Sequence, residues 1–161
     1  MKKTIEIPYE ELSSEKELSI EEQNLLAMAE EATKNSYSPY SKFHVGAALL
    51  LENGEIITGN NQENAAYPTG LCAERVAFFY SGAKYPNVPI KTVAITAYSE
   101  EIPVSSPVPP CGDCRQAMIE YEERYGKKIR VIMRGATGKV IIFDKIADLL
   151  PFHFDNSDLG M

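Results

Sequence analysis

Two cysteines stand three positions apart in the segment PCGDCR, at Cys111 and Cys114, and the remaining cysteine of the chain is Cys72. With C-x-x-C spacing at the start of a helix, two sulfur atoms can face the same point. Cys72 also opens a segment of helical composition, and the partial positive charge at a helix N-terminus favours thiolates. Because all three cysteines stand where a thiolate is favoured, we expect them to bind one metal ion together.

Zinc is the metal that this ligand set predicts, since it takes four tetrahedral ligands and binds thiolate sulfur at about 2.3 Å. A structural site would fill the fourth position with Cys or His, but the chain has no fourth cysteine, and His44 and His153 lie at no ligand spacing. The expected site therefore keeps one position open for water, as catalytic zinc sites do. Two alternatives stay open: the thiols are small buried apolar groups, or Cys111 and Cys114 form a reactive redox pair.

Glu74 follows Cys72 by two residues, which places a carboxylate next to the expected metal. Such a carboxylate can take a proton from the water and return it to a leaving group. Zinc with three thiolates carries a net negative charge and is a weak Lewis acid, so the sulfur charge must be drawn away. We expect Arg75 to do this from outside the ligand set, through hydrogen bonds to the thiolates.

Length and charge restrict the class of protein. A chain of 161 residues suits one domain with a full core. The net charge of -7 disfavours nucleic-acid binding, which requires Lys and Arg against phosphates. No apolar run is long enough to span a bilayer, and no signal-peptide pattern opens the chain. We therefore expect a cytoplasmic protein with no membrane partner, whose odd number of thiols stays reduced.

The segments that must position these residues alternate between helical and strand patterns. Residues 1–18 form a charged leader that we expect to be partly ordered, and Ser19 followed by Glu22 is a capping box that opens a helix. Helices are predicted after Ser19 and at 71–82, 111–126 and 146–150, and strands at 43–51, 55–59, 91–99, 128–135 and 139–145. This order predicts an α/β fold in which residues 19–161 form a single three-layer domain, a mixed five-stranded sheet with helices on both faces.

Four segments of the chain carry a resemblance to a known family: YSPYSKFHVGAALL, GNNQENAAYPTGLCAER, PCGDCRQ and LLPFHF. They contain C-x-E followed by P-C-x-x-C, the signature of zinc deaminases. With these segments, the chain resembles the small homotetrameric cytidine deaminases. The resemblance implies the same α/β fold, one Zn²⁺ per chain on the three cysteines, and Glu74 as the proton shuttle. The implied reaction is hydrolysis of cytidine and 2′-deoxycytidine to uridine and 2′-deoxyuridine plus ammonia, in pyrimidine salvage. It also implies a homotetramer, in which Phe154 matches an aromatic residue that reaches into a neighbouring subunit's site.

The resemblance also implies substrate contacts within one chain. Asn61 and Glu63, in NQEN, match the pair that hydrogen-bonds the ribose 3′-hydroxyl, and Phe43 matches the aromatic residue that packs on the pyrimidine. The main chain near Ala73 and Pro109 matches the part that binds the base.

Other functions stay open alongside this one. The substrate could be another aminopyrimidine, such as blasticidin S, although the NQEN pair favours a ribose with a free 3′-hydroxyl. A polynucleotide deaminase would use the same zinc site, but the acidic charge and the same 3′-hydroxyl contact argue against it. A zinc-stabilised binding module without catalysis and a thiol-redox protein are the alternatives outside this class.

Overall fold

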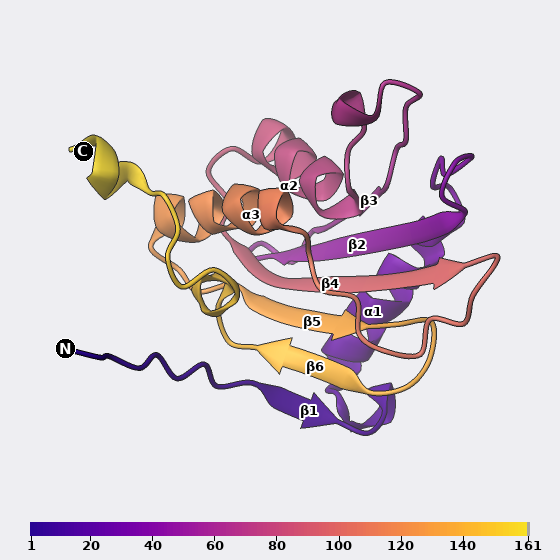
Figure 1. Cartoon of the computed structure of the whole chain (residues 1–161), viewed down its shortest axis with the longest axis horizontal. Helices are drawn as coiled ribbons and strands as arrows, with labels where there is room; N and C mark the ends of the chain where they lie inside the picture. Colours follow the sequence, from indigo (N-terminus) through magenta and orange to yellow (C-terminus); the bar gives the residue numbers. More distant parts are fainter. Residues whose placement is uncertain (161) are drawn as a thin grey trace.

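The computed structural model describes residues 1–160, which form one mixed sheet with helices packed on it (Figure 1). The sheet has six strands in the order β1-β6-β5-β4-β2-β3. Neighbouring strands are antiparallel except for β4 and β5, which are parallel and are joined through helix α3. The elements are β1 (Glu10–Leu12), α1 (Ile20–Thr33), β2 (Phe43–Leu51), β3 (Ile56–Asn60), α2 (Ala73–Lys84), β4 (Ile90–Ser99), α3 (Gly112–Tyr125), β5 (Arg130–Arg134) and β6 (Val140–Phe143).

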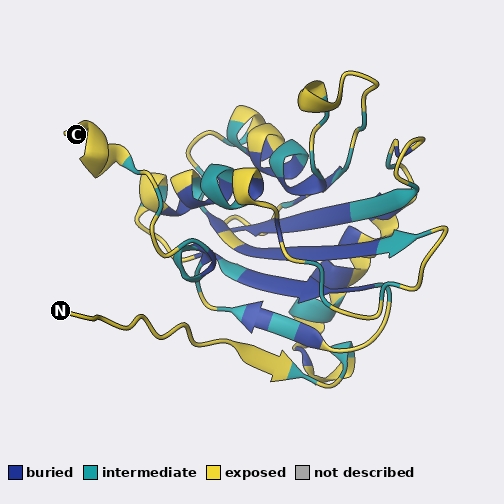
Figure 2. Ribbon diagram, viewed as in Figure 1, coloured by how far each residue is buried: buried dark blue, intermediate teal, exposed yellow. Residues whose placement is uncertain are grey.

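The predicted three-layer α/β domain is confirmed, because helices cover both faces of the sheet (Figure 1). Along β2, Ala47 and Leu49 belong to the core that includes residues of α2 and α3, whereas Ala48 and Leu50 belong to the core that includes residues of α1. The central strands are therefore buried on both sides (Figure 2). Burial on both faces explains why FHVGAALLL is apolar without alternation.

The prediction of five strands was wrong, because Glu10–Leu12 adds a sixth strand that pairs antiparallel with β6. The same leader segment reaches the body of the fold at two further points. Glu15 forms an ion pair with Arg134, whose side chain is 5% exposed, and Leu18 is buried in the core beneath α1. A three-residue strand containing two glutamates has little strand propensity of its own, so its place is decided by the free edge of β6.

Local sequence signals explain how several elements begin and end. The capping box forms at the start of α1, where Ser19 accepts from the backbone of Glu22 and Glu22 accepts from the backbone of Ser19. The turn between β2 and β3 contains Gly54 at φ 84°, a left-handed conformation that suits glycine. The predicted final helix is a short 3-10 helix, Ile146–Leu149.

Across residues 1–160, no helix combines the length and the apolar character that crossing a membrane requires.

Gly59 on β3 determines how closely α2 can approach the sheet. A Cβ at this position would lie 2.5 Å from the carbonyl oxygen of Ala73 and 2.7 Å from the backbone nitrogen of Ala77. Both contacts are shorter than van der Waals distance and both involve backbone, so only glycine allows this packing. The first turn of α2, which carries Glu74, is thereby held directly against β3.

Candidate metal centre and substrate cavity

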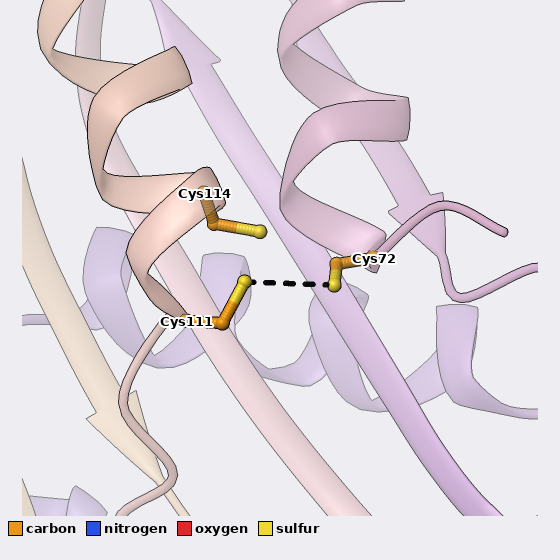
Figure 3. Close-up of side chains that lie close together, drawn as sticks. All are labelled: Cys72, Cys111 and Cys114. Atoms are coloured by element: carbon orange, nitrogen blue, oxygen red, sulfur yellow. Dashed lines mark hydrogen bonds between the residues drawn. The ribbon is translucent and has the colours of Figure 1, made fainter. Parts of the chain in front are cut away.

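The starts of α2 and α3 bring the three cysteines together (Figure 3). Cys72 and Cys111 are the N-cap residues of the two helices, and Cys114 lies in the first turn of α3. Neither N-cap cysteine makes a side-chain capping hydrogen bond, unlike Ser or Asp at such a position, so each sulfur is free to face the neighbouring helix. The three Sγ atoms lie within 4.8 Å of one another.

This donor set fits a zinc ion. Four tetrahedral ligands with Zn–S bonds of about 2.3 Å place two sulfur atoms about 3.8 Å apart. The Sγ atoms of Cys72 and Cys111 are 3.9 Å apart, so this pair could bind zinc with almost no movement. Over the described part of the chain, the cluster contains these three ligand residues and no His, Asp or Glu. Three protein ligands leave one tetrahedral position for water or substrate.

The electrostatics of the cluster favour a thiolate at Cys72. A hydrogen bond from Cys114 lowers the pKa of the Cys72 thiol to about 5, and the guanidinium of Arg75 adds to this effect. The pKa of Cys114 is raised, because its thiol donates that hydrogen bond and is buried. The Nε of Arg75 is buried and has no hydrogen-bond acceptor among the described residues. A half-buried cation with a spare buried donor suits a site that gathers negative sulfur ligands.

Glu74 lies in the same site and is only 4% exposed. Burial raises the pKa of the Glu74 carboxyl to about 7, and the negative charge of Cys72 adds to the rise. A carboxyl group with a pKa near neutrality can both accept and release a proton under physiological conditions. Glu74 is thus suited to carry protons between groups of this site.

A cavity of about 690 Å³ adjoins the cysteines and brings together most of the residues proposed from the sequence. Phe43, Asn61, Glu63 and Pro109 line it with Cys72, Glu74, Arg75 and Cys111. Ala73 is fully buried behind this lining, and Phe154 lies elsewhere, 57% exposed, with its backbone oxygen accepting a hydrogen bond from Gln116. Sequence reasoning did not assign the lining residues Tyr40, Ser41, Val45, Gln62, Asn64, Gly70, Leu71 and Val108, and it left Tyr67 undecided.

One of these missed residues was detectable. Phe43 and Val45 are alternate residues of β2, and alternate residues of a strand share a face. Once Phe43 is assigned to the cavity, the period of the strand indicates Val45 as well. Tyr40 and Ser41 carry no such signal, because they lie in an irregular turn.

Asn61 and Glu63 have structural hydrogen bonds that sequence reasoning did not predict. The Asn61 amide donates to Ser38 Oγ and to the Phe43 carbonyl, each at 2.9 Å, and accepts from the Val45 N–H at 2.8 Å. Glu63 accepts from the Ser41 hydroxyl and from the N–H groups of Tyr40 (3.0 Å) and Ser41 (3.2 Å).

These bonds also affect the charge of the cavity wall. Burial alone would raise the pKa of the Glu63 carboxyl, but the hydrogen bonds from Ser41 and Tyr40 outweigh burial and lower it. Glu63 is therefore ionised at neutral pH. The loop that contains Asn61 and Glu63 and the turn that contains Tyr40 and Ser41 form one hydrogen-bonded wall.

Known proteins resemble this chain over most of its length. Residues 19–128 match the model of the family described as the cytidine and deoxycytidylate deaminase zinc-binding region. A cytidine deaminase of Halalkalibacterium halodurans is 38% identical over 143 residues, which cover 88% of this chain and 99% of that protein. One of Sporosarcina psychrophila is 39% identical over 138 residues, 86% of this chain and 94% of that protein. The crystal structure of a cytidine deaminase from Burkholderia pseudomallei superposes with a TM-score of 0.72 at 34% identity, covering 85% of this chain and all of that one.

Proposed function

The chain belongs to the cytidine and deoxycytidylate deaminase family of hydrolytic enzymes, and on this premise we propose that it deaminates cytidine and 2′-deoxycytidine to uridine and 2′-deoxyuridine. The observation that carries the proposal is a single cavity in which Glu74 and the thiol cluster adjoin Phe43, Asn61 and Glu63. Release of ammonia from a free nucleoside is a reaction of pyrimidine salvage, to which we assign the enzyme.

We infer that Cys72, Cys111 and Cys114 hold one Zn²⁺ per chain. Zinc bound there supplies Lewis-acid chemistry that makes a water molecule acidic enough to act as the nucleophile near neutral pH. The 3.9 Å separation of two of the sulfur atoms and the half-buried guanidinium of Arg75 support this assignment. Because the thiols must stay reduced to bind metal, we place the enzyme in the cytoplasm.

Glu74 moves the protons of the reaction. Its carboxylate takes a proton from the attacking water as the water oxygen bonds to C4 of cytosine, and it delivers that proton to N3. It then takes the remaining proton of the new hydroxyl group and gives it to the amino group, which leaves as ammonia while the C4 carbonyl forms. Phe43 packs on the pyrimidine, and the main chain near Ala73 and Pro109 binds the base. Burial of the Glu74 carboxyl raises its pKa and so favours proton uptake, which both transfers require.

The charges of the cavity favour a nucleoside over a nucleotide. Among the residues that line it, Arg75 is the only Lys or Arg, and it lies beside Cys72. Glu63 and Glu74 are both acidic. A 5′-phosphate would therefore find carboxylates and no free cation on this wall, which supports cytidine over deoxycytidylate as the substrate class.

Ammonia release by the purified protein, with zinc quantified in the same sample, tests this proposal. We expect turnover of cytidine and 2′-deoxycytidine with one zinc per chain. CMP should have a kcat/KM at least about 100-fold lower, because its phosphate meets like charge. Zinc binding without nucleoside turnover would contradict the substrate assignment, and activity on blasticidin S would then indicate another aminopyrimidine as the substrate.

We also propose that the enzyme works as a homotetramer whose sites are completed by neighbouring subunits. Phe152 and Phe154 are 88% and 57% exposed, so their rings are available to pack against a neighbouring subunit. Light scattering should give a mass about four times the chain mass of 17.9 kDa. Phe154→Ala should raise KM about tenfold without loss of zinc, since an aromatic contact is removed from the neighbour's site. A fully active monomer would contradict this proposal.

A further inference from the structure

His44 lies directly behind the wall of the substrate cavity. Its neighbours on β2, Phe43 and Val45, line the cavity, so the side chain of His44 is directed to the opposite face of the strand. There its ring stacks on Tyr98, its cross-strand partner on β4, with ring centroids 4.6 Å apart and planes within 9°. The His44 side chain is only 12% exposed.

Both ring nitrogens of His44 have hydrogen-bond partners. Nε2 lies 3.0 Å from Glu100 Oε1, and Nδ1 lies 2.6 Å from Ser36 Oγ. An ionised carboxylate can only accept, so Nε2–H donates to Glu100. In the tautomer that leaves Nδ1 without a proton, Nδ1 accepts from the Ser36 hydroxyl, and both ring nitrogens are then satisfied at once.

From Ser36, further hydrogen bonds lead to Asn61 in the cavity wall. Ser36 Oγ accepts from Ser38 Oγ at 3.5 Å, and Ser38 Oγ accepts from the Asn61 amide at 2.9 Å. The chain of donors thus runs from Asn61 through Ser38 and Ser36 to His44 and Glu100. The contact between the two serines is the longest link, so the network depends mainly on the Ser36–His44, His44–Glu100 and Asn61–Ser38 bonds.

The turn spanned by this network, residues 36–42, needs support. Lys42 has φ 54°, a left-handed conformation that costs free energy for a residue with a side chain. The Lys42 N–H donates to the Ser38 carbonyl and its carbonyl accepts from the Glu100 N–H, each at 3.1 Å. Glu100 therefore holds the turn both through its backbone and through His44.

We propose that His44 is a positioning residue of the substrate cavity. It ties turn 36–42, through Ser36 and Glu100, to the residue that follows β4, and it thereby fixes the wall on which Tyr40 and Ser41 hold Glu63. The bonds of this network join β2, the end of β4 and two loops, whereas the thiol cluster and Glu74 come from the starts of α2 and α3. Its loss should therefore weaken substrate binding and leave the chemical step intact. The part concerning substrate rests on the proposed deaminase function.

His44→Phe tests the proposal, because phenylalanine keeps the stacking on Tyr98 and removes both hydrogen bonds. We expect KM for cytidine and Kd for uridine to rise about tenfold with kcat within about twofold of the parent, as loss of a hydrogen-bonded wall predicts. Zinc content should not change. Amide hydrogen exchange at residues 40–43 should become at least about tenfold faster, because the turn opens locally more often. Ser36→Ala should also raise KM and speed up exchange. His44→Gln keeps a donor and an acceptor, so its KM and exchange rates should lie between those of His44→Phe and the parent.

Thr33→Val is the matched structural control. Thr33 is 2% exposed at the end of α1, and its hydroxyl donates to the Glu30 carbonyl at 2.7 Å, outside the network. This variant should lose stability while KM and the exchange rates stay at parent values. If His44→Phe has the KM and the exchange rates of the parent, the proposal is overturned, even if its Tm is lowered. If His44→Phe does not fold, the same measurements on Ser36→Ala decide. Should the parent not deaminate cytidine, the proposed function fails, while hydrogen exchange still decides whether His44 holds the turn.

Discussion

Glu74→Gln is expected to reduce cytidine turnover at least about 1,000-fold while zinc content and fold are retained. The substituted side chain has the same shape and remains at a position that is 4% exposed, so the packing at the start of α2 is preserved. What is lost is the group that carries protons between water, N3 and the leaving amine, because an amide does not accept a proton near neutral pH. Steady-state ammonia release and metal analysis on one preparation measure both effects.

This variant also discriminates between classes of function. A zinc-stabilised binding module without catalysis would give a Glu74→Gln protein indistinguishable from the parent in every activity. Residual turnover within about tenfold of the parent would mean that another group carries the protons, since general acid–base catalysis by one side chain is worth more than that.

Cys114→Ser is expected to abolish zinc binding and, with it, turnover. Cys114 is fully buried, and its sulfur is one of three donors within 4.8 Å of one another. A serine hydroxyl stays protonated near neutral pH and is a poor zinc ligand, so two thiols remain where three protein ligands are required. After dialysis against a mild chelator, zinc should fall from about one per chain to below about a tenth, and activity should fall in parallel.

The two variants should give different combinations of results, and each serves as the other's control. Glu74→Gln keeps zinc and loses turnover, whereas Cys114→Ser loses both. A Cys114→Ser protein that still binds one zinc and turns over cytidine would show that the thiol cluster is not the metal site. Fast alkylation of Cys111 and Cys114 in the parent, unaffected by zinc or chelator, would instead favour the thiol-redox alternative.

Local signals in the sequence were sufficient for much of the fold and for the candidate metal ligands. The capping box at Ser19 and the strand at 43–51 depend on neighbouring residues and on the pattern of the segment, and each has the expected outcome. The three cysteines were assigned to one site because each stands at the start of a helix, a placement that is visible without knowledge of the partner.

The tertiary structure decided the features that depend on contacts between distant segments. Cys72 and Cys111 are 39 residues apart, and they meet because α2 and α3 pack side by side on one face of the sheet with their N-termini adjacent. The three-residue strand β1 exists because β6 offers it a free edge. The sequence position of His44 indicated no role for it. Its hydrogen-bond and stacking partners come together only when the turn, β2 and β4 are assembled. Propensity and periodicity are properties of short segments, whereas these contacts depend on which surfaces are brought together when the chain packs its two cores.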